Sequence, residues 1–403
     1  METLKQRLVI NSRRYLKVIK LLLAAGAQAR LVGGVVRDAL ARFPSSDVDI
    51  ATDFSPEQVT ALLEANKIKV IPTGIKFGTI LAVTGGETFE ITTLREDLSC
   101  DGRRAIVKYT NDFKKDAERR DFTINALSYC PIKHEIYDYF NGIEDLKKRR
   151  VVFIGNAEAR IQEDYLRILR FFRFSCRFSK ELDEPSFQAC VRYKDKLSIL
   201  SRERVKSEMD ALLKLRKSPK FLAIMNSCGI LKEVFPIKHY DYKLHSRAIN
   251  IARKYKSWPC LSVVYAILLH KDPEISLSSL IDMKFSKAEA KIIMQLIALR
   301  HIKEKNQLVI KLKTLWLDEI SCVQYFIFAS VFIKDYQYIF DLYNGLLSRQ
   351  KPILPIKGND LIKIGLSGQN LGSLIRKLKE EWIQSEFTLQ KADLINLAEQ
   401  YEK

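Results

Sequence analysis

The hydrophobic pattern of the first third of the chain changes its period several times and predicts a mixture of helices and strands. Leucine and isoleucine recur at helical spacing in residues 16–26 and predict an opening helix that ends at Gly26. Three short apolar runs predict strands, at residues 29–32, 78–83 and 88–94. The following stretch, residues 95–112, is polar and is predicted to be a mobile loop.

The rest of the pattern is helical. A helix start is predicted at Ser55, because Pro56 suits the first helical position and Gln58 completes a capping box. From about residue 147 onward the period is almost wholly helical, with few glycines. A stretch with two prolines and a glycine, residues 351–358, predicts a linker into a small helical unit.

The composition adds a large positive charge to this picture. The 403 residues are 47% hydrophobic, which suffices for two to four folded domains. The formal net charge of +19 predicts a polyanionic partner, and nucleic acid fits better than a membrane. The seven cysteines form no Cys-x-x-Cys motif, so neither a zinc knuckle nor a disulfide framework is predicted. Without a signal-peptide pattern or a bilayer-length apolar run, we expect a soluble, cytoplasmic protein.

Two aspartates stand side by side in a strand-like stretch, S-S-D-V-D-I-A-T, at residues 45–52. Side chains of a strand alternate between its faces, so Asp47 and Asp49 are expected to point the same way. Two like charges about 4 Å apart repel by roughly 4 kcal/mol at an effective dielectric of 20. A divalent cation with oxygen ligands would relieve this repulsion, so the pair predicts a metal site.

Asp-x-Asp also occurs in proteins of other function and on protein surfaces. Nucleotide-sugar glycosyltransferases use Asp-x-Asp as well, and a solvated surface pair would show the same spacing. An EF-hand loop is excluded, because its sixth position would be Thr52 in place of glycine. The chain has no Walker A motif, which argues against a P-loop ATPase or GTPase.

A pair of glycines marks a predicted turn from a strand into a helix, in the sequence L-V-G-G-V-V-R-D. Gly33 and Gly34 let a phosphate approach the backbone, and free amides at a helix start attract anions. Arg37 adds a forked donor in the first helical turn. An ordinary turn also explains the glycines, but their position just upstream of the aspartates favours a phosphate site.

Two later segments carry dense polar groups beside apolar residues. Residues 119–127 read R-R-D-F-T-I-N-A-L and offer donors and acceptors suited to phosphate and ribose. Residues 163–174 read E-D-Y-L-R-I-L-R-F-F-R-F, where Asp164 and Arg167 would share one helix face. A helix start and a surface ion pair would explain these segments taken singly.

Taken in order, the four segments resemble the motifs of the class II tRNA nucleotidyltransferases, the CCA-adding enzymes, and of the related bacterial poly(A) polymerases. The resemblance rests on G-G-x-V-R-D, D-x-D-I-A-T, R-R-D-F-T-x-N-A and E-D-x-x-R within residues 20–180. It implies an α+β nucleotidyltransferase head, with a mixed β-sheet and helices, followed by an elongated all-α neck, body and tail. The implied bounds are 1–146 for the head, 147–213 for the neck, 214–350 for the body and 351–403 for a tRNA-binding tail.

The resemblance also implies roles for individual residues. Asp47 and Asp49 would bind Mg²⁺ and carry catalysis. The nucleotide-binding residues would be Gly33, Gly34, Arg37, Arg120, Asp121, Asn125, Asp164, Arg167 and Arg170. Glu90, on a neighbouring predicted strand, is a candidate third carboxylate, although a strand glutamate that faces water would look the same. The implied partners are tRNA, CTP and ATP, with no membrane and no protein partner.

Hydrogen bonding explains how an aspartate and an arginine would select C and A. Cytosine and adenine both present an amine donor beside a ring-nitrogen acceptor, whereas uracil and guanine present the reverse. Asp164 would accept from the amine and Arg167 would donate to the ring nitrogen, the templating role that the resemblance implies. Because residues 95–112 keep the pattern of the family's switch loop, we favour full CCA addition. The alternatives are a poly(A) polymerase, a CC- or A-adding enzyme, and an inactive RNA-binding protein.

Overall fold

The computed structural model describes residues 14–44, 48–75, 78–100, 105–235, 237, 240–318, 322–334, 336–366 and 371–402. The chain divides into two compact units, Met1–Phe235 and Pro236–Lys403. The four-part division into head, neck, body and tail stays a prediction, because the structure separates only these two units.

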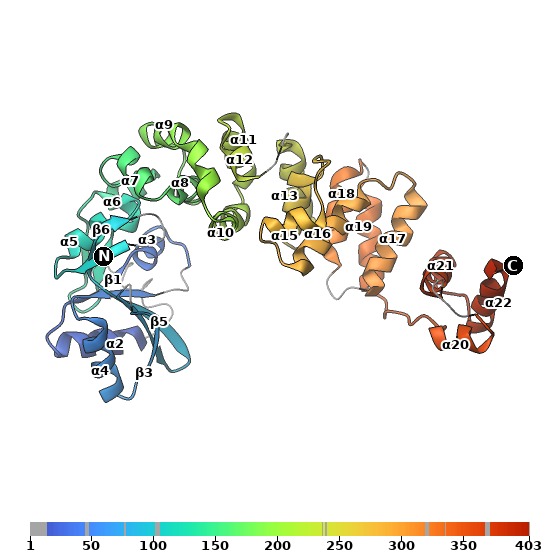
Figure 1. The fold of residues 1–403 in the computed structure, drawn as a ribbon, viewed down its shortest axis with the longest axis horizontal. Coiled ribbons are helices and arrows are strands. Elements are labelled where there is room, and N and C mark those ends of the chain that lie inside the picture. Colours follow the sequence, from blue (N-terminus) through green and yellow to red (C-terminus); the bar gives the residue numbers. More distant parts are fainter. Residues whose placement is uncertain are drawn as a thin grey trace. The chain divides into compact units, whose positions relative to one another are not determined.

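A mixed sheet of seven strands forms the N-terminal part of the first unit (Figure 1). Its order is β3-β4-β5-β2-β1-β8-β9. Strands β2 and β5 run parallel, and the other neighbours in the sheet are antiparallel. The strands are β1 (Ala29–Val32), β2 (Asp49–Thr52), β3 (Lys69–Gly74), β4 (Thr79–Thr84), β5 (Glu87–Thr93), β8 (Ser128–Cys130) and β9 (Glu135–Tyr137). The predicted mixed sheet is confirmed.

Three helices near the start of the chain pack against this sheet. They are α2 (Arg14–Ala24), α3 (Gly34–Leu40) and α4 (Pro56–Ala65). The predicted capping box at the start of α4 is confirmed, with the Gln58 amide donating to Ser55 Oγ and the Ser55 amide to Gln58 Oε1. Leu22 of α2 and Leu63 of α4 share one core with Ile50 of β2. The buried face of the sheet therefore sets where β2 and its aspartate lie.

The polar stretch after β5 is a two-stranded antiparallel ribbon, and the prediction of a loop is wrong for it. The strands are β6 (Arg95–Cys100) and β7 (Ala105–Tyr109), while residues 101–104 lie outside the described part. Lys115 pairs with Glu96 at 2.9 Å and helps to hold the ribbon against α5 (Phe113–Glu118). A polar ribbon outside the main sheet lacks the alternation of apolar residues that reveals a half-buried strand, so its pattern resembled a loop.

Short helices complete the first unit. After α5 follow η2 (Thr123–Asn125), α6 (Gly142–Lys147), α7 (Ala157–Glu163), α8 (Leu166–Phe178), α9 (Glu184–Arg192), η3 (Lys194–Ile199), α10 (Arg202–Leu213), α11 (Ser218–Ser227) and α12 (Ile230–Val234). Phe171 of α8 stacks on Phe153, and both rings contact Phe122. This aromatic cluster joins α8 to the segment that carries the R-R-D-F-T motif.

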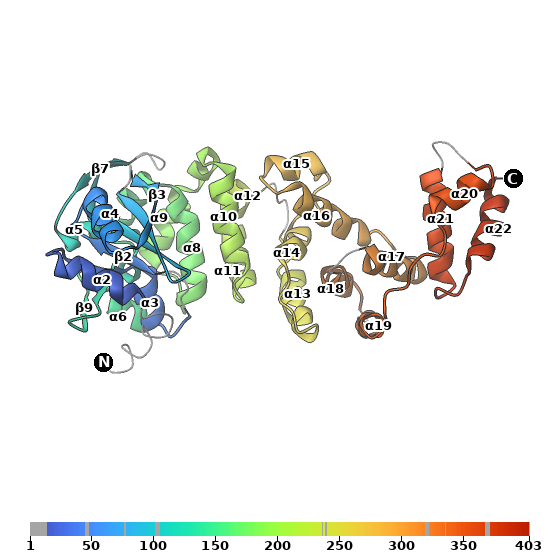
Figure 2. The same ribbon diagram turned by 90° about the horizontal axis from the view of Figure 1, so that it is seen from below.

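The second unit contains only helices within its described residues (Figure 2). They are α13 (Tyr242–Lys254), α14 (Leu261–Leu269), α15 (Leu277–Asp282), α16 (Lys287–Leu299), α17 (Lys305–Asp318), α18 (Val323–Phe332), α19 (Gln337–Leu347), α20 (Gly358–Lys363), α21 (Leu371–Gln384) and α22 (Lys391–Glu402). The predicted linker is confirmed as the non-helical stretch between α19 and α20. No helix in the described ranges has the length and apolar character needed to cross a membrane.

A glycine beside η2 offers a test of how tightly this region is packed. A Cβ at Gly142 would lie 2.3 Å from the carbonyl oxygen of Thr123, which is backbone and cannot swing away. We expect Gly142→Ala to lower the free energy of unfolding by about 1–3 kcal/mol. Gly345→Ala in α19 meets no atom within 4 Å and is expected to raise it by about 0.5–1 kcal/mol. Denaturant unfolding followed by circular dichroism measures both, and equal effects of the two changes would contradict the clash.

Candidate functional site

The glycine turn and the aspartate strand meet at one end of the sheet. Strands β1 and β2 are antiparallel with Leu31 opposite Ile50, so the turn after β1 lies beside the start of β2. Gly33 has φ 67° and ψ −121°, a backbone conformation that favours glycine. A Cβ at Gly33 would lie 2.7 Å from Nη1 of Arg120, so the turn also lacks room for a side chain. The predicted turn is confirmed, and Arg120 approaches it closely.

Asp49 begins β2 and lies directly opposite Glu90 of the parallel strand β5. Side chains at such paired positions point to the same face, and neighbouring strands are about 5 Å apart. Two carboxylates at that spacing are oxygen donors suited to a divalent cation. Asp47 lies outside the described residues, and the described part holds no group of three or more His, Cys, Asp or Glu side chains placed to bind a metal. Asp49 and Glu90 supply two oxygen donors on one face, and the metal site predicted at Asp47 and Asp49 stays a prediction.

Arg119 and Arg120 are held from two sides. The buried Asp116 of α5 pairs with Arg119 at 2.8 Å and with Arg120 at 3.3 Å. Burial disfavours the charged form of Asp116, but the two guanidinium groups outweigh it and hold its pKa below the usual range. Arg160 of α7 donates through Nη2 to the carbonyl oxygens of both arginines. The backbone of the R-R-D motif is thereby fixed next to the glycine turn.

A chain of hydrogen bonds connects the glycine turn, the R-R-D-F-T segment and α8. Arg37 Nη1 donates to Asn125 Oδ1 at 2.5 Å, and Asn125 Nδ2 donates to Asp121 Oδ1 at 2.8 Å. Arg170 Nε of α8 donates to Asp121 Oδ2 at 2.7 Å. Burial opposes the charge on Asp121, yet the pKa of this carboxyl is lowered because Arg170, Asn125 and an amide favour the charged form. Residues from α3, η2 and α8 thus form one network.

Arg37 is mostly engaged inside the protein. It is 6% exposed, and its guanidinium also binds Asp38, from Nε at 2.8 Å and from Nη2 at 2.7 Å. Asp38 in turn pairs with Arg177 of α8 at 3.0 Å. Burial lowers the pKa of Arg37, and Asp38 opposes this change. These bonds use three of the five N–H donors of Arg37, and its Nη2 would lie 3.6 Å from a Cβ at Gly34, so the predicted phosphate contact stays a prediction.

Asp164 does not lie in a helix with Arg167, so that prediction is wrong. Helix α7 ends at Glu163, and Asp164 has φ −157° and ψ 105° before α8 begins at Leu166. Its Oδ1 accepts the Leu166 amide at 3.1 Å, a side-chain bond to the exposed amides of a helix start. The aspartate competes for these amides and interrupts a helix that periodicity alone predicted as continuous.

The two residues implied in base selection have separate partners. Asp164 Oδ2 pairs with Arg204 of α10 at 2.6 Å. Arg167 pairs with Glu163 at 2.6 Å and donates to the carbonyl oxygen of Arg160 at 2.8 Å. Each is therefore held in place by a charged neighbour, and both side chains are partly exposed, at 17% and 11%.

Several residues of the network were not predicted as site residues. Glu208 of α10 lies between Arg170 at 3.4 Å and Arg173 at 2.6 Å. Although burial opposes the charge on Arg170, Asp121 and Glu208 outweigh this effect and raise its pKa. The sequence carries a signal for the arginines, because they recur every three or four residues on one face of α8. It carries none for Glu208, because this residue lies too far along the chain from the arginines to be found from residue spacing.

The lowered pKa of Asp121 predicts how the free energy of unfolding changes in acid. A carboxyl whose pKa is lower in the folded than in the unfolded state stabilises the fold above the unfolded pKa of about 3.9. This contribution is lost as the pH falls through the lower folded pKa. We expect Asp121→Asn to lose stability at neutral pH and to show a shallower decline below about pH 4 than the unsubstituted chain. Urea unfolding at a series of pH values measures this, and identical slopes would contradict it.

Comparisons with known proteins agree with this architecture. Residues 29–152 match the family described as "Poly A polymerase head domain", and residues 181–241 match "Probable RNA and SrmB- binding site of polymerase A". The crystal structure of the Bacillus stearothermophilus CCA-adding enzyme in complex with CTP superposes with a TM-score of 0.78 at 24% identity, covering 96% of each chain. The Thermotoga maritima CCA-adding enzyme complexed with tRNA gives 0.69 at 18% identity, covering 100% of this chain and 99% of that one. These likenesses show the fold.

The relatives match at higher identity over nearly the whole chain. The mitochondrial CCA tRNA nucleotidyltransferase 1 of Danio rerio is 33% identical over 380 residues, which cover 93% of this chain and 87% of that protein. The CCA-adding enzyme of Streptococcus pyogenes is 30% identical over 378 residues, which cover 91% of both. Identity at this level across both units shows that the chain belongs to the CCA tRNA nucleotidyltransferase family.

Proposed function

We propose that this chain adds CCA to the 3′ end of tRNA, using CTP and ATP, releasing pyrophosphate, and needing no nucleic-acid template. The observation that carries the proposal is the hydrogen-bonded network, which brings segments around residues 37, 121–125 and 170 together beside the glycine turn. Family membership supports it, since relatives matched over nearly the full chain carry this activity in their names.

The carboxylates at the start of β2 would hold Mg²⁺. Asp47 and Asp49 are the proposed ligands, and Glu90, directly opposite Asp49, is the proposed third carboxylate. Magnesium held there would neutralise charge on the reacting phosphate and would help to activate the primer hydroxyl. The strand pairing of β2 with β5 places the two described carboxylates on one face before any ligand binds.

The turn at Gly33 and Gly34 would receive the triphosphate. The absence of side chains on the turn lets phosphate oxygens reach backbone amides. Arg120 lies against the turn and is 22% exposed at its side chain, so its guanidinium can contribute to the same site. Asp116 and Arg160 hold this arginine segment rigidly, which lowers the entropy cost of binding.

Asp121 is better suited to positioning than to the ribose contact that the resemblance implies. It is 6% exposed, and its two oxygens already accept from Arg170, from Asn125 and from the Phe122 amide. A carboxylate offers about four acceptor positions, so most of its capacity is used. Asn125 is equally buried, and its amide is bonded to Arg37 and to Asp121, so it suits a positioning role as well. We propose that Asp121 orients Arg170, whose side chain is 32% exposed, and that Arg170 faces the nucleotide.

Asp164 and Arg167 would read the base edge of the incoming nucleotide. Asp164 would accept from the amine of C or A while Arg204 holds the carboxylate in place. Arg167 would donate to the ring nitrogen while Glu163 holds its guanidinium. A uracil or guanine would leave these partly buried charges unpaired, and sites of this type discriminate by up to about 10⁴.

A template-independent poly(A) polymerase is the second candidate. It is favoured by one observation, the match of residues 29–152 to the poly(A) polymerase head domain. The two functions would share the metal and triphosphate sites and differ in product length. The length of the products made on an end-labelled tRNA that lacks its last three nucleotides, measured on a gel, distinguishes the two functions.

Product analysis tests the proposed function directly. With Mg²⁺ and CTP we expect two added residues, and with CTP and ATP three residues ending in A. Asp49→Asn should lower kcat at least 100-fold, because the transition state loses several kcal/mol of charge stabilisation. Glu90→Gln should lower kcat as well, whereas Glu87→Gln, three residues away on the opposite face of β5, should not. Long A tails would identify the polymerase, and no product in any mixture would contradict both.

Nucleotide choice tests the base-reading pair. We expect Asp164→Ala and Arg167→Ala to reduce the preference for CTP over UTP by at least about tenfold, because the discriminating bonds are removed. Binding of tRNA, measured by fluorescence anisotropy, should change little. Arg192→Ala is the matched control, since Arg192 forms an exposed ion pair with Glu158 in the same unit. Unchanged selectivity of both site variants would refute the pairing.

A further inference from the structure

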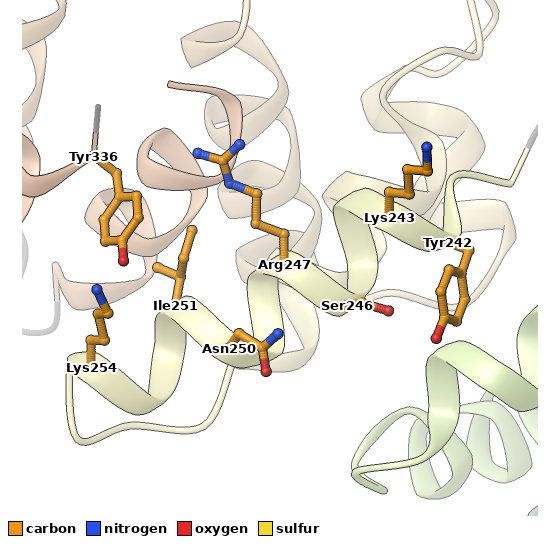
Figure 3. A pocket seen from close by; sticks show the side chains of 8 residues that line it. All are labelled: Tyr242, Lys243, Ser246, Arg247, Asn250, Ile251, Lys254 and Tyr336. Carbon is orange, nitrogen blue, oxygen red and sulfur yellow. The ribbon is translucent and has the colours of Figure 1, made fainter. Parts of the chain in front are cut away.

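A basic groove lies in the second unit, and all the described residues that line it belong to that unit. It has a volume of about 400 Å³ and is formed by α13 together with Tyr336 at the start of α19 (Figure 3). Lys254 and Tyr336 face each other at one end, and Lys243 and Tyr242 lie at the other. Of the described residues that line it, three are basic and none is acidic.

The polar groups of the groove follow one stripe of α13. Lys243, Arg247, Asn250 and Lys254 are spaced by four, three and four residues, so they lie along the same face of the helix. The other side of α13 is packed, with His245, Ala248, Ile249 and Ala252 buried. At 1.5 Å per residue the stripe spans roughly 16 Å, which is enough to follow several phosphates of one RNA strand.

Within the part of the chain that the structure describes, no carboxylate pairs with the basic side chains of the groove. Arg247 donates to the carbonyl oxygens of Ser330 and Ile333 at the end of α18, which fixes its position and leaves its positive charge. Among the described residues, Lys243 and Lys254 form no ion pair, and the Lys254 ammonium lies 4.5 Å from the centre of the Tyr336 ring. Elsewhere in this unit Lys313, Lys379 and Lys391 each pair with an acidic side chain. Uncompensated charge held in a groove attracts anions.

We propose that this groove binds the phosphodiester backbone of the tRNA. The ammonium groups of Lys243 and Lys254 contact phosphates, and the half-exposed Tyr242 offers a flat surface to a ribose or base. The contact is independent of sequence, which suits an enzyme that accepts many tRNAs. A free nucleotide fits less well, because its phosphates occupy one point whereas the lysines stand at the two ends of the stripe. The proposal rests on the proposed function only in naming tRNA as the RNA.

The test is tRNA binding by the full chain at several salt concentrations, measured by anisotropy without nucleotide. Each phosphate contact contributes about 0.7–0.9 to the slope of log K against log salt. We expect Lys243→Ala/Lys254→Ala to lower that slope by about 1.4–1.8 and to weaken binding roughly tenfold to thirtyfold near 0.15 M salt. The KM for tRNA should rise accordingly, while kcat and the KM for CTP stay unchanged. Lys243→Arg/Lys254→Arg should retain wild-type binding.

The matched control is Lys287→Ala/Lys291→Ala, which removes two exposed charges from α16 of the same unit. Equal weakening by the control would reduce the effect to net charge and overturn the proposal, as would an unchanged affinity of the groove variant. A fall in the number of CTP molecules bound without RNA would assign the groove to a nucleotide instead. Failure of the unsubstituted chain to extend tRNA would refute the proposed function alone, because the binding measurement needs no catalysis.

Discussion

A row of arginines on α8 is the feature on which the candidate site depends. Four guanidinium groups lie along one side of this helix, and each meets a carboxylate from a different element. The pairs are Arg167–Glu163, Arg170–Asp121, Arg173–Glu208 and Arg177–Asp38. Asp121, Glu208 and Asp38 are largely shielded from water, so loss of their arginine would leave a desolvated charge, whereas Glu163 is 38% exposed and its pair contributes less. These pairs favour one alignment of α3, α10 and the R-R-D segment on α8.

This alignment explains why the chemistry sits on irregular backbone. The glycine turn and the break before α8 would both be mobile if they stood alone, since neither is covered by a regular hydrogen-bond ladder. Here Arg120 lies against Gly33, and Arg204 pairs with Asp164, so each irregular segment is held by a charged side chain from another element. The aromatic contacts of Phe122 and Phe171 add apolar packing beneath the charges. Rigid support of this kind places reacting groups before the substrate arrives.

Much of the fold could be predicted from the sequence, and the gaps have physical causes. Strand and helix periods located β1, β4, β5, α2 and α4, because these elements bury one apolar face. The ribbon of β6 and β7 was missed since a polar hairpin outside the main sheet has no such face. The break at Asp164 was missed because a single side-chain bond to a helix amide overrides an unbroken apolar period. Motif order brought the site segments to notice, but Glu208 and Arg204 depend on contacts across about 40 residues, which spacing does not encode.

The interruption of the helix before α8 has a geometric consequence for Asp164. Inside a continuous helix the Leu166 amide would bond a carbonyl of the preceding turn, and no free amide would be left for this carboxylate. Because Asp164 is extended, one of its oxygens accepts the Leu166 amide while the other pairs with Arg204 of α10. A single carboxylate therefore fastens the first turn of α8 to a helix that follows it some forty residues later in the chain.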